Sequence, residues 1–381
     1  MDQGWAVVDG LTDWLGPEAI VLLRDPESGV RAVVVVDNTA CGPGIGGLRM
    51  APDVTVGEVA RLARAMTLKS AAAGLAHGGA KAGLAADPAM PPRDKENVIR
   101  WFAQAIRDVH AYIPGPDMGT DERCMAWIHD EIGRSVGLPE VLGGIPLDEL
   151  GATGFGLAVA AEVASDALAV LSLAGARVAI QGFGAVGAHA ARFLAQRGAT
   201  IVAVSDLGGA VTDPAGLPVD ELLAWKDAGR SVATFGRGAV GPPEAPLAVD
   251  CDILVPAARP DAVTEANVEG VKARLVLEGA NIPVTAGAEA LLHERGVLCL
   301  PDWIVNAGGL ICAAVEYDGG TRDAGLERIE AQIRANTTAV LDRALKEGRM
   351  PREVAEEMAL VRVTDATALR RSFPAPALSR S

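Results

Sequence analysis

Two lysines twelve residues apart have the residue type and setting for acid–base chemistry on a small molecule. At 100° per residue, Lys69 falls on the face of a predicted helix that also carries Leu62 and Met66, so its amine is directed inward. Lys81 lies in the segment 77–83, whose small residues let a ligand approach the backbone. A second ammonium in a closing cleft lowers the pKa of one lysine through like-charge repulsion and desolvation. Such a lysine can act as a base near neutral pH.

Asp117 is a third candidate, in the Gly- and Pro-containing segment 112–120. Spacing leaves a second interpretation open for all three residues, in which Lys69 reaches solvent, Lys81 is an ordinary loop lysine and Asp117 is a turn residue. Taken alone, the spacing favours this second interpretation.

A glycine-rich turn in the second half of the chain predicts a dinucleotide site. The apolar strand 177–181 is followed by Gly182-Phe-Gly184-Ala185-Val186-Gly187 and an amphipathic helix, which is the setting in which G-x-G-x-x-G binds a pyrophosphate. The first glycine makes the tight turn, the second lets backbone N–H groups approach the anion, and the third lets helix and strand pack closely. The anion then lies at the helix N-terminus, where unpaired N–H groups favour it.

The end of the next strand indicates which dinucleotide to expect. Strand 200–205 ends at Asp206, where a carboxylate can accept hydrogen bonds from the adenosine ribose and would repel a 2′-phosphate. We therefore expect NAD, with NADP as the alternative because a basic side chain elsewhere could accommodate the phosphate.

Two kinds of architecture must position these residues. In the first 150 residues, the runs 19–24 and 30–36 predict a hairpin, and helices are expected over 56–72 and from Glu96 to Tyr112, the latter ended by Pro114. From residue 153 onward helices and strands alternate, which is typical of a doubly wound parallel sheet. The elements expected there are helices 153–168, 185–196, 218–228 and 322–347, a helix opened by Pro351, and strands 177–181, 200–205, 252–255, 274–277 and 297–300.

The predicted fold class is therefore α/β with two domains. The segment 143–151, with its glycines and proline, is the expected hinge. We expect a substrate-binding α/β domain over 1–145, to which C-terminal helices in 335–381 return, and a Rossmann-type domain over 150–330.

Composition argues against several other functions. The 34 Lys and Arg against 49 Asp and Glu give a net charge of −15, which repels nucleic acid and anionic lipid, so neither is an expected partner. No run of 18 apolar residues is present to span a membrane. The five histidines and five cysteines lack metal-ligand spacing, so no metal is expected. Scattered cysteines and an acidic N-terminus favour a reducing cytoplasm.

Further motifs are shared, in order and at similar spacing, with a known family. The first half contains Pro52-Asp-Val-Thr, Met66-Thr-Leu-Lys69, Gly78-Gly79-Ala-Lys81-Ala-Gly, Gly115-Pro-Asp117-Met-Gly-Thr and Met125-Ala-Trp-Ile. The second half contains Ala152-Thr153-Gly154, Cys251-Asp-Ile-Leu-Val-Pro-Ala257, Glu278-Gly-Ala-Asn281 and Asn306-Ala-Gly-Gly309. From about residue 30 to about residue 345 the chain resembles the glutamate/leucine/phenylalanine/valine dehydrogenase family.

This resemblance implies reversible oxidative deamination of an L-amino acid to a 2-oxo acid and ammonia. It implies that Lys69 holds the substrate α-carboxylate, that Lys81 is the catalytic lysine and that Asp117 carries protons to and from the amine. A homo-oligomer, either a hexamer or an octamer, is also implied. The other contacts implied are Gly46, Gly47, Met66, Gly78, Gly79 and Asn306 for the substrate, and Thr153, Ala257 and Asn281 for the cofactor. A non-catalytic NAD-binding sensor is an alternative, but it would not need Lys69, Lys81 and Asp117 together.

Two departures from the family pattern bear on the substrate side chain. Glutamate-specific members carry a lysine just before Gly46-Gly47, where this chain has Ile45, and a serine where it has Ala313. A buried substrate carboxylate without a partner is costly, whereas Ile45, Met66 and Ala313 suit an apolar side chain. The expected substrate is therefore an apolar amino acid of the leucine, valine or phenylalanine type, with glutamate as the alternative.

Overall fold

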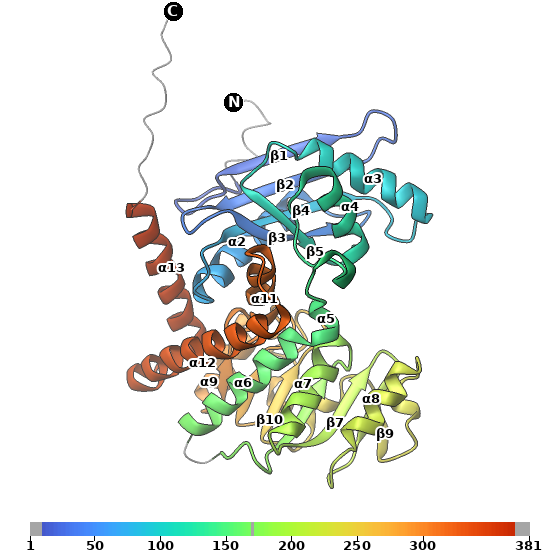
Figure 1. The fold of residues 1–381 in the computed structure, drawn as a ribbon. Helices are drawn as coiled ribbons and strands as arrows, with labels where there is room; N and C mark the ends of the chain where they lie inside the picture. The colour runs from blue at the N-terminus through green and yellow to red at the C-terminus, as the bar shows by residue number, and fades with distance from the viewer. Residues whose placement is uncertain (1–9, 169–170, 370–381) are drawn as a thin grey trace, which may run out of the picture.

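The computed structural model describes residues 10–168 and 171–369, so residues 1–9 and 370–381 of the predicted first domain lie outside the described part. Two sheets, one in each half of the chain, organise the fold (Figure 1). The first sheet has the strand order β1-β2-β4-β3-β5. Its strands are β1 (Ala19–Arg24), β2 (Arg31–Asn38), β3 (Gly44–Met50), β4 (Gly78–Ala85) and β5 (Tyr112–Pro116).

Strand β2 is buried on both faces of the first sheet. It pairs antiparallel with β1, as the predicted hairpin requires, and antiparallel with β4 on its other side. Val34 and Val36 belong to the core under helices α3 (Pro92–Ala105) and α4 (Glu122–Ile132). Val33 and Val35 point to the opposite face and pack against helix α2 (Val56–Ala72). Because both faces are covered, β2 is a continuous apolar run rather than an alternating one.

Helix α2 was predicted with its observed bounds, whereas the prediction for α3 was wrong. The helix expected from Glu96 to Tyr112 begins instead at Pro92 and ends at Ala105. Tyr112 starts β5, where it pairs with Gly44 of β3, and Pro114 lies inside that strand. The apolar residues beyond Ala105 are therefore buried in turns and in β5 rather than in a helix. Pairing of β5 with β3, which is distant in the sequence, replaces the last helical turns that were predicted.

The second sheet confirms the predicted doubly wound topology. Its order is β12-β11-β10-β6-β7-β8-β9, and neighbouring strands from β12 to β7 are parallel. The strands are β6 (Arg177–Gln181), β7 (Thr200–Asp206), β8 (Gly209–Thr212), β9 (Ala239–Gly241), β10 (Ile253–Pro256), β11 (Leu275–Leu277) and β12 (Leu298–Leu300). The antiparallel edge strands β8 and β9 were not predicted.

The C-terminal helices connect the two halves. Helix α12 packs on α6, whereas α13 reaches α2 of the first half (Figure 1). None of the described helices is long and apolar enough to cross a membrane. The helices of this half are α5 (Leu147–Leu150), α6 (Ala152–Ala167), α7 (Ala185–Gln196), α8 (Val219–Asp227), α9 (Ala286–Glu294), α10 (Asp302–Val305), α11 (Gly308–Tyr317), α12 (Arg322–Glu347) and α13 (Pro351–Leu369), and short 3₁₀ turns cover Glu140–Leu142, Val232–Thr234, Ala245–Ala248 and Val268–Gly270.

Candidate active site

A cavity of about 940 Å³ is lined by residues of both halves, and the candidate residues Lys69, Lys81 and Asp117 all line it. The first half also contributes Ile45, Gly46, Gly47, Met66, Gly115, Pro116, Thr120, Asp121, Glu122, Arg123, Val136, Gly137 and Pro139. The second half contributes Leu147, Thr153, Asn281, Gly309, Leu310 and Ala313.

Lys81 and Asp117 form a buried ion pair, with Lys81 Nζ 3.1 Å from Asp117 Oδ2. Only 8% of the Lys81 side chain is exposed, and burial lowers the pKa of its amine although the charge of Asp117 opposes the shift. Burial alone would raise the pKa of the Asp117 carboxyl, but the charges of Lys81 and Arg49 outweigh it and hold that pKa below its usual range. The site therefore contains a carboxylate next to a lysine that gives up its proton more readily than a lysine in water does.

Arg49 is a member of this group that sequence reasoning missed. Its Nε lies 3.0 Å from the same oxygen of Asp117, and its Nη1 contacts Glu58 Oε1 at 2.5 Å. No local signal marked it, because the segment 44–50 was not predicted as a strand; in the structure Arg49 lies on β3, two residues beyond Gly47 and on the same face of the strand.

Glycine on β3 allows the ion pair to form. A Cβ at Gly47 would lie 2.7 Å from Asp117 Cβ and 3.1 Å from Lys81 Nζ. A Cβ at Gly46 would collide with the carbonyl oxygen of Ala80 at 1.7 Å. Lys81 belongs to strand β4 rather than to the loop considered above, and antiparallel pairing with Val35 of β2 fixes its position.

Lys69 approaches the cavity from α2, as its helical face predicts. Burial lowers the pKa of its amine to about 8, Asp302 opposes this shift, and Lys81 adds to it by repulsion. Gly78 and Gly79 do not line the cavity. A Cβ at Gly79 would lie 2.1 Å from the backbone nitrogen of Thr67, so this glycine lets β4 pack against α2 and brings the two lysine-bearing elements together.

The opposite wall of the cavity carries Asn281, which follows β11. Asn306 does not line the cavity, but its Nδ2 donates to Asn281 Oδ1 at 3.2 Å and to the carbonyl oxygens of Gly279 and Ala280 at 3.3 and 3.2 Å. Asn306 thus holds the loop that presents Asn281. Thr153, at the start of α6, lines the cavity beside it.

The glycine-rich turn fits a dinucleotide. Gly182 has φ of 96°, which favours glycine, and a Cβ at Gly187 would lie 1.8 Å from the carbonyl oxygen of Gly182. A Cβ at Gly184 would meet no atom within 4 Å, so the backbone there is open to a ligand. Helix α7 begins at Ala185, which Val186 follows, and no side chain caps its N-terminus. Its first backbone N–H groups are therefore left to bind an anion. Ala257 directly follows strand β10, and its N–H donates to the carbonyl oxygen of Gln181, the last residue of the neighbouring strand β6, at 2.7 Å.

Asp206 differs from the expectation, because its carboxylate is already engaged. Oδ2 accepts from Lys226 Nζ at 2.6 Å and from the Val232 N–H at 3.0 Å. Oδ1 accepts from Ser231 Oγ at 2.7 Å and from the Gly208 N–H at 2.9 Å. Four donors fill the lone pairs that a ribose would need, and Lys226 compensates the charge that would repel a phosphate.

Comparison with known proteins identifies related chains over most of the length of this chain. Residues 17–134 match the Glu/Leu/Phe/Val dehydrogenase, dimerisation domain, and residues 143–371 match Glutamate/Leucine/Phenylalanine/Valine dehydrogenase. An NADP(+)-dependent glutamate dehydrogenase of Pyrobaculum calidifontis is 41% identical over 301 residues, which cover 74% of this chain and 71% of the relative. NAD-specific glutamate dehydrogenase A of Halobacterium salinarum is 38% identical over 350 residues, covering 87% and 80%. Among solved structures, a hetero-hexameric glutamate dehydrogenase of Thermus thermophilus in a leucine-bound form superimposes with a TM-score of 0.84 at 33% identity, covering 94% of this chain and 91% of the other.

Proposed function

The chain belongs to the glutamate/leucine/phenylalanine/valine dehydrogenase family, and from this premise we propose that it catalyses the reversible oxidative deamination of L-glutamate to 2-oxoglutarate and ammonia. It is an NAD(P)-dependent amino acid dehydrogenase that acts on a CH–NH₂ group. The observation that carries the proposal is the buried Lys81–Asp117 pair next to the inward Lys69 in one cavity.

The three residues have distinct proposed roles in the deamination. Lys69, in its protonated form, holds the substrate α-carboxylate. Asp117, kept charged by Lys81 and Arg49, accepts a proton from the substrate ammonium group. A nicotinamide cofactor, when bound, supplies the acceptor for the hydride of Cα, which leaves an imine.

Lys81 then acts on the imine. Its lowered pKa suits it to take a proton from the water that attacks the imine carbon. In the protonated form it faces the oxygen on which negative charge develops, and little water surrounds it to weaken the attraction. Asp117 returns a proton to the amine of the tetrahedral intermediate, and the hydroxyl proton leaves with the departing ammonia as ammonium. Lys81 then releases to solvent the proton that it took from water, so one ammonium ion and one proton leave per hydride transferred and both groups regain their starting protonation states.

The relatives favour glutamate over the apolar substrate that the sequence predicted. Both curated relatives and the solved structure described above are glutamate dehydrogenases. Lys69 and Lys81 have other proposed roles, and Arg123 is the further cation among the described lining residues, exposed at the rim. Arg123 supports the proposal because a substrate γ-carboxylate needs a cationic partner.

An apolar L-amino acid stays a second candidate because of the cavity wall. Ile45 and Ala313 are buried there, beside Leu310 and Val136, where glutamate-specific members of the family would offer a lysine and a serine. Initial rates with L-glutamate, L-leucine, L-valine and L-phenylalanine, each with NAD and NADP, test the proposal. Glutamate should have the highest kcat/KM, and a faster reaction with any of the three apolar amino acids would overturn this choice of substrate.

Replacing Ile45 by lysine should raise kcat/KM for glutamate by about 10- to 100-fold, which is the effect of one added charge-assisted hydrogen bond. The new ammonium would offer the γ-carboxylate a buried partner in addition to the exposed Arg123, whereas an apolar substrate side chain would face a buried charge. Steady-state kinetics with glutamate and leucine measure the switch, and Ile45→Met is the matched uncharged control. A fall in both rates would contradict this view of the wall.

We also propose that the protein binds both NAD and NADP, because Lys226 compensates the charge of Asp206. In Lys226→Ala the carboxylate would face the 2′-phosphate without compensation, so the Kd for NADPH should rise about 10-fold relative to that for NADH. Fluorescence of the bound reduced cofactor measures both constants. The exposed Lys346 on α12 provides the control variant Lys346→Ala, and failure of the unmodified protein to bind NADPH would refute the proposal.

Three broader predictions accompany this function. We propose the division into a substrate-binding part over 1–145 and 335–381 and a nucleotide-binding part over 150–330. A homo-oligomer is proposed on the family's dimerisation domain and on the hexameric relative. A cytoplasmic location stays a prediction from the cysteine usage.

A further inference from the structure

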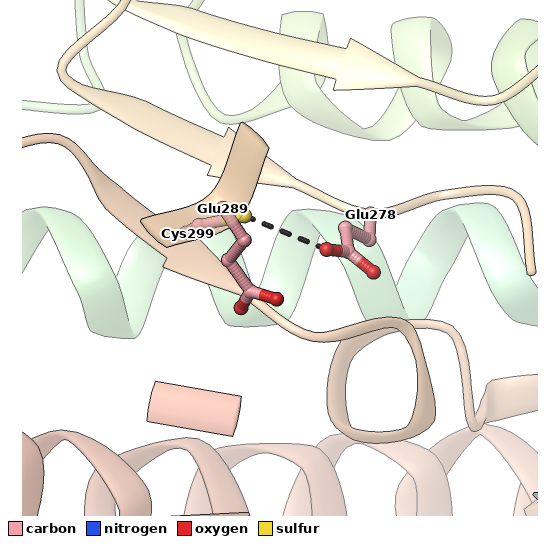
Figure 2. A group of neighbouring side chains, drawn as sticks. All are labelled: Glu278, Glu289 and Cys299. Carbon is pink, nitrogen blue, oxygen red and sulfur yellow. Dashed lines mark hydrogen bonds between the residues drawn. The ribbon is translucent and has the colours of Figure 1, made fainter. Parts of the chain in front are cut away.

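A cluster of buried acidic groups lies beside strands β11 and β12, and none of its members lines the cavity. Glu278 follows β11, Glu289 lies on α9 and Cys299 on β12, and their side chains converge (Figure 2). Cys299 Sγ is 3.5 Å from Glu278 Oε1. Asp302, at the start of α10, joins the cluster through its backbone N–H, which donates to Glu278 Oε2 at 3.1 Å.

These groups have donors suited to a metal ion, but an arginine supplies the positive charge. Arg352 of α13 places Nη2 2.7 Å from both oxygens of Glu278. Its Nε lies 2.5 Å from Glu289 Oε2, and its Nη1 lies 3.5 Å from Asp302 Oδ1. One guanidinium therefore contacts three carboxylates that come from three different elements.

Arg352 compensates the charge of these buried carboxylates. Glu278 and Glu289 are 0% and 2% exposed, and Glu289 Oε1 has no hydrogen-bond partner. Burial raises the pKa of Glu278 to about 7 and raises that of Glu289, while Arg352 opposes both shifts. Without Arg352 the cluster would hold uncompensated buried charge, and its members would move apart or take up protons.

The cluster connects directly to the loop that carries Asn281. Asp302 Oδ2 accepts the N–H of Ile282 at 3.1 Å. Ile282 has φ of 51°, a left-handed conformation that a β-branched residue adopts only when its surroundings impose it. Asn281, the preceding residue, lines the cavity. The bond from Asp302 is therefore one restraint that keeps this strained loop in place.

The same helix also holds the other wall of the cavity. Arg362 of α13 donates to the carbonyl oxygen of Leu75 at 2.9 Å and to that of Ala71 at 3.4 Å, at the end of α2. Lys69 lies on the last turn of α2, and Asp302 is the carboxylate that acts on its charge. Helix α13 thus contacts the supports of both Asn281 and Lys69.

We propose that Arg352 is a positioning residue for the cofactor and substrate walls of the cavity: it holds Asp302, and Asp302 holds the Asn281 loop. This inference rests on the proposed function, because it assumes that Asn281 contacts the bound nucleotide. Arg352 does not line the cavity and acts through Asp302, which it contacts directly and through Glu278.

Arg352→Lys tests the proposal, because it keeps the charge and loses the fork that contacts three carboxylates at once. The Kd for NADH should rise about 10-fold and KM for the amino acid should rise several-fold, while kcat changes less than about threefold. In the protein without ligands, amide hydrogen exchange at Ile282 should become faster. Arg349→Lys, in the turn just before α13 and paired with Glu347, Glu353 and Glu357, is the matched control and should behave as the unmodified protein.

If Arg352→Lys does not fold, Glu278→Gln tests the proposal in its place. Glutamine keeps an acceptor for the Asp302 N–H but weakens the contact with Arg352, so the same changes are expected at smaller size. A folded variant with unchanged NADH affinity and unchanged exchange at Ile282 would overturn the proposal. If the unmodified protein turns over no amino acid, the proposed function fails instead, and the exchange measurement still decides whether Arg352 holds the loop.

Discussion

Replacing Lys81 by alanine is expected to lower kcat about 10³-fold or more, since the variant loses both a general base and the cation that faces the developing oxyanion. The amine is buried against Asp117, so bulk water cannot take over its role. The Kd for NADH should stay within about threefold of the unmodified value, because Lys81 lies on β4 of the first sheet, whereas the glycine-rich turn follows β6 of the second. Stopped-flow turnover and cofactor fluorescence measure the two quantities.

The control for Lys81→Ala is Lys346→Ala, which removes an exposed lysine from α12. This control should leave both quantities unchanged. Comparable turnover in Lys81→Ala and in the unmodified protein would show that the reaction does not require Lys81. Absence of turnover by the unmodified protein with every amino acid, together with NADH binding, would favour the alternative of a non-catalytic sensor.

Local signals in the sequence were enough for part of this site. The apolar face of α2 predicted both its bounds and the inward direction of Lys69, and in the structure the side chain of Thr55 caps the start of that helix. The strand-turn-helix context likewise predicted α7 and the glycine-rich turn. These features depend on residues within a few positions of one another, and propensity and capping act over that range.

Features that depend on distant residues were not predictable in the same way. Strands β3 and β4 are rich in glycine and lack alternation, and they are strands because β2 and β5 pair with them. The charge compensation of Asp206 depends on Lys226, twenty residues away on another element. Arg49 joins Asp117 across the sheet, at a sequence separation of 68 residues. In each case the partner is chosen by tertiary packing, which no local pattern contains.

Replacing Asp117 by asparagine is expected to lower kcat by about 10²- to 10³-fold, because the amide cannot accept the proton of the substrate ammonium group. The change also removes the negative charge that raises the pKa of Lys81, while the burial that lowers it remains. The pKa of Lys81 should therefore fall further. In the profile of kcat/KM against pH, the rising limb that requires neutral Lys81 should move to lower pH than in the unmodified protein.

Asp130→Asn is the matched control, since it removes a carboxylate on α4 that pairs with Arg100 at the surface. Its rate and pH profile should equal those of the unmodified protein. A rising limb that stays in place or moves to higher pH in Asp117→Asn would show that the limb does not report Lys81. A large loss of kcat with the expected downward shift would instead separate the two roles of Asp117: it exchanges a proton with the substrate, and its charge sets the pH at which Lys81 becomes a base.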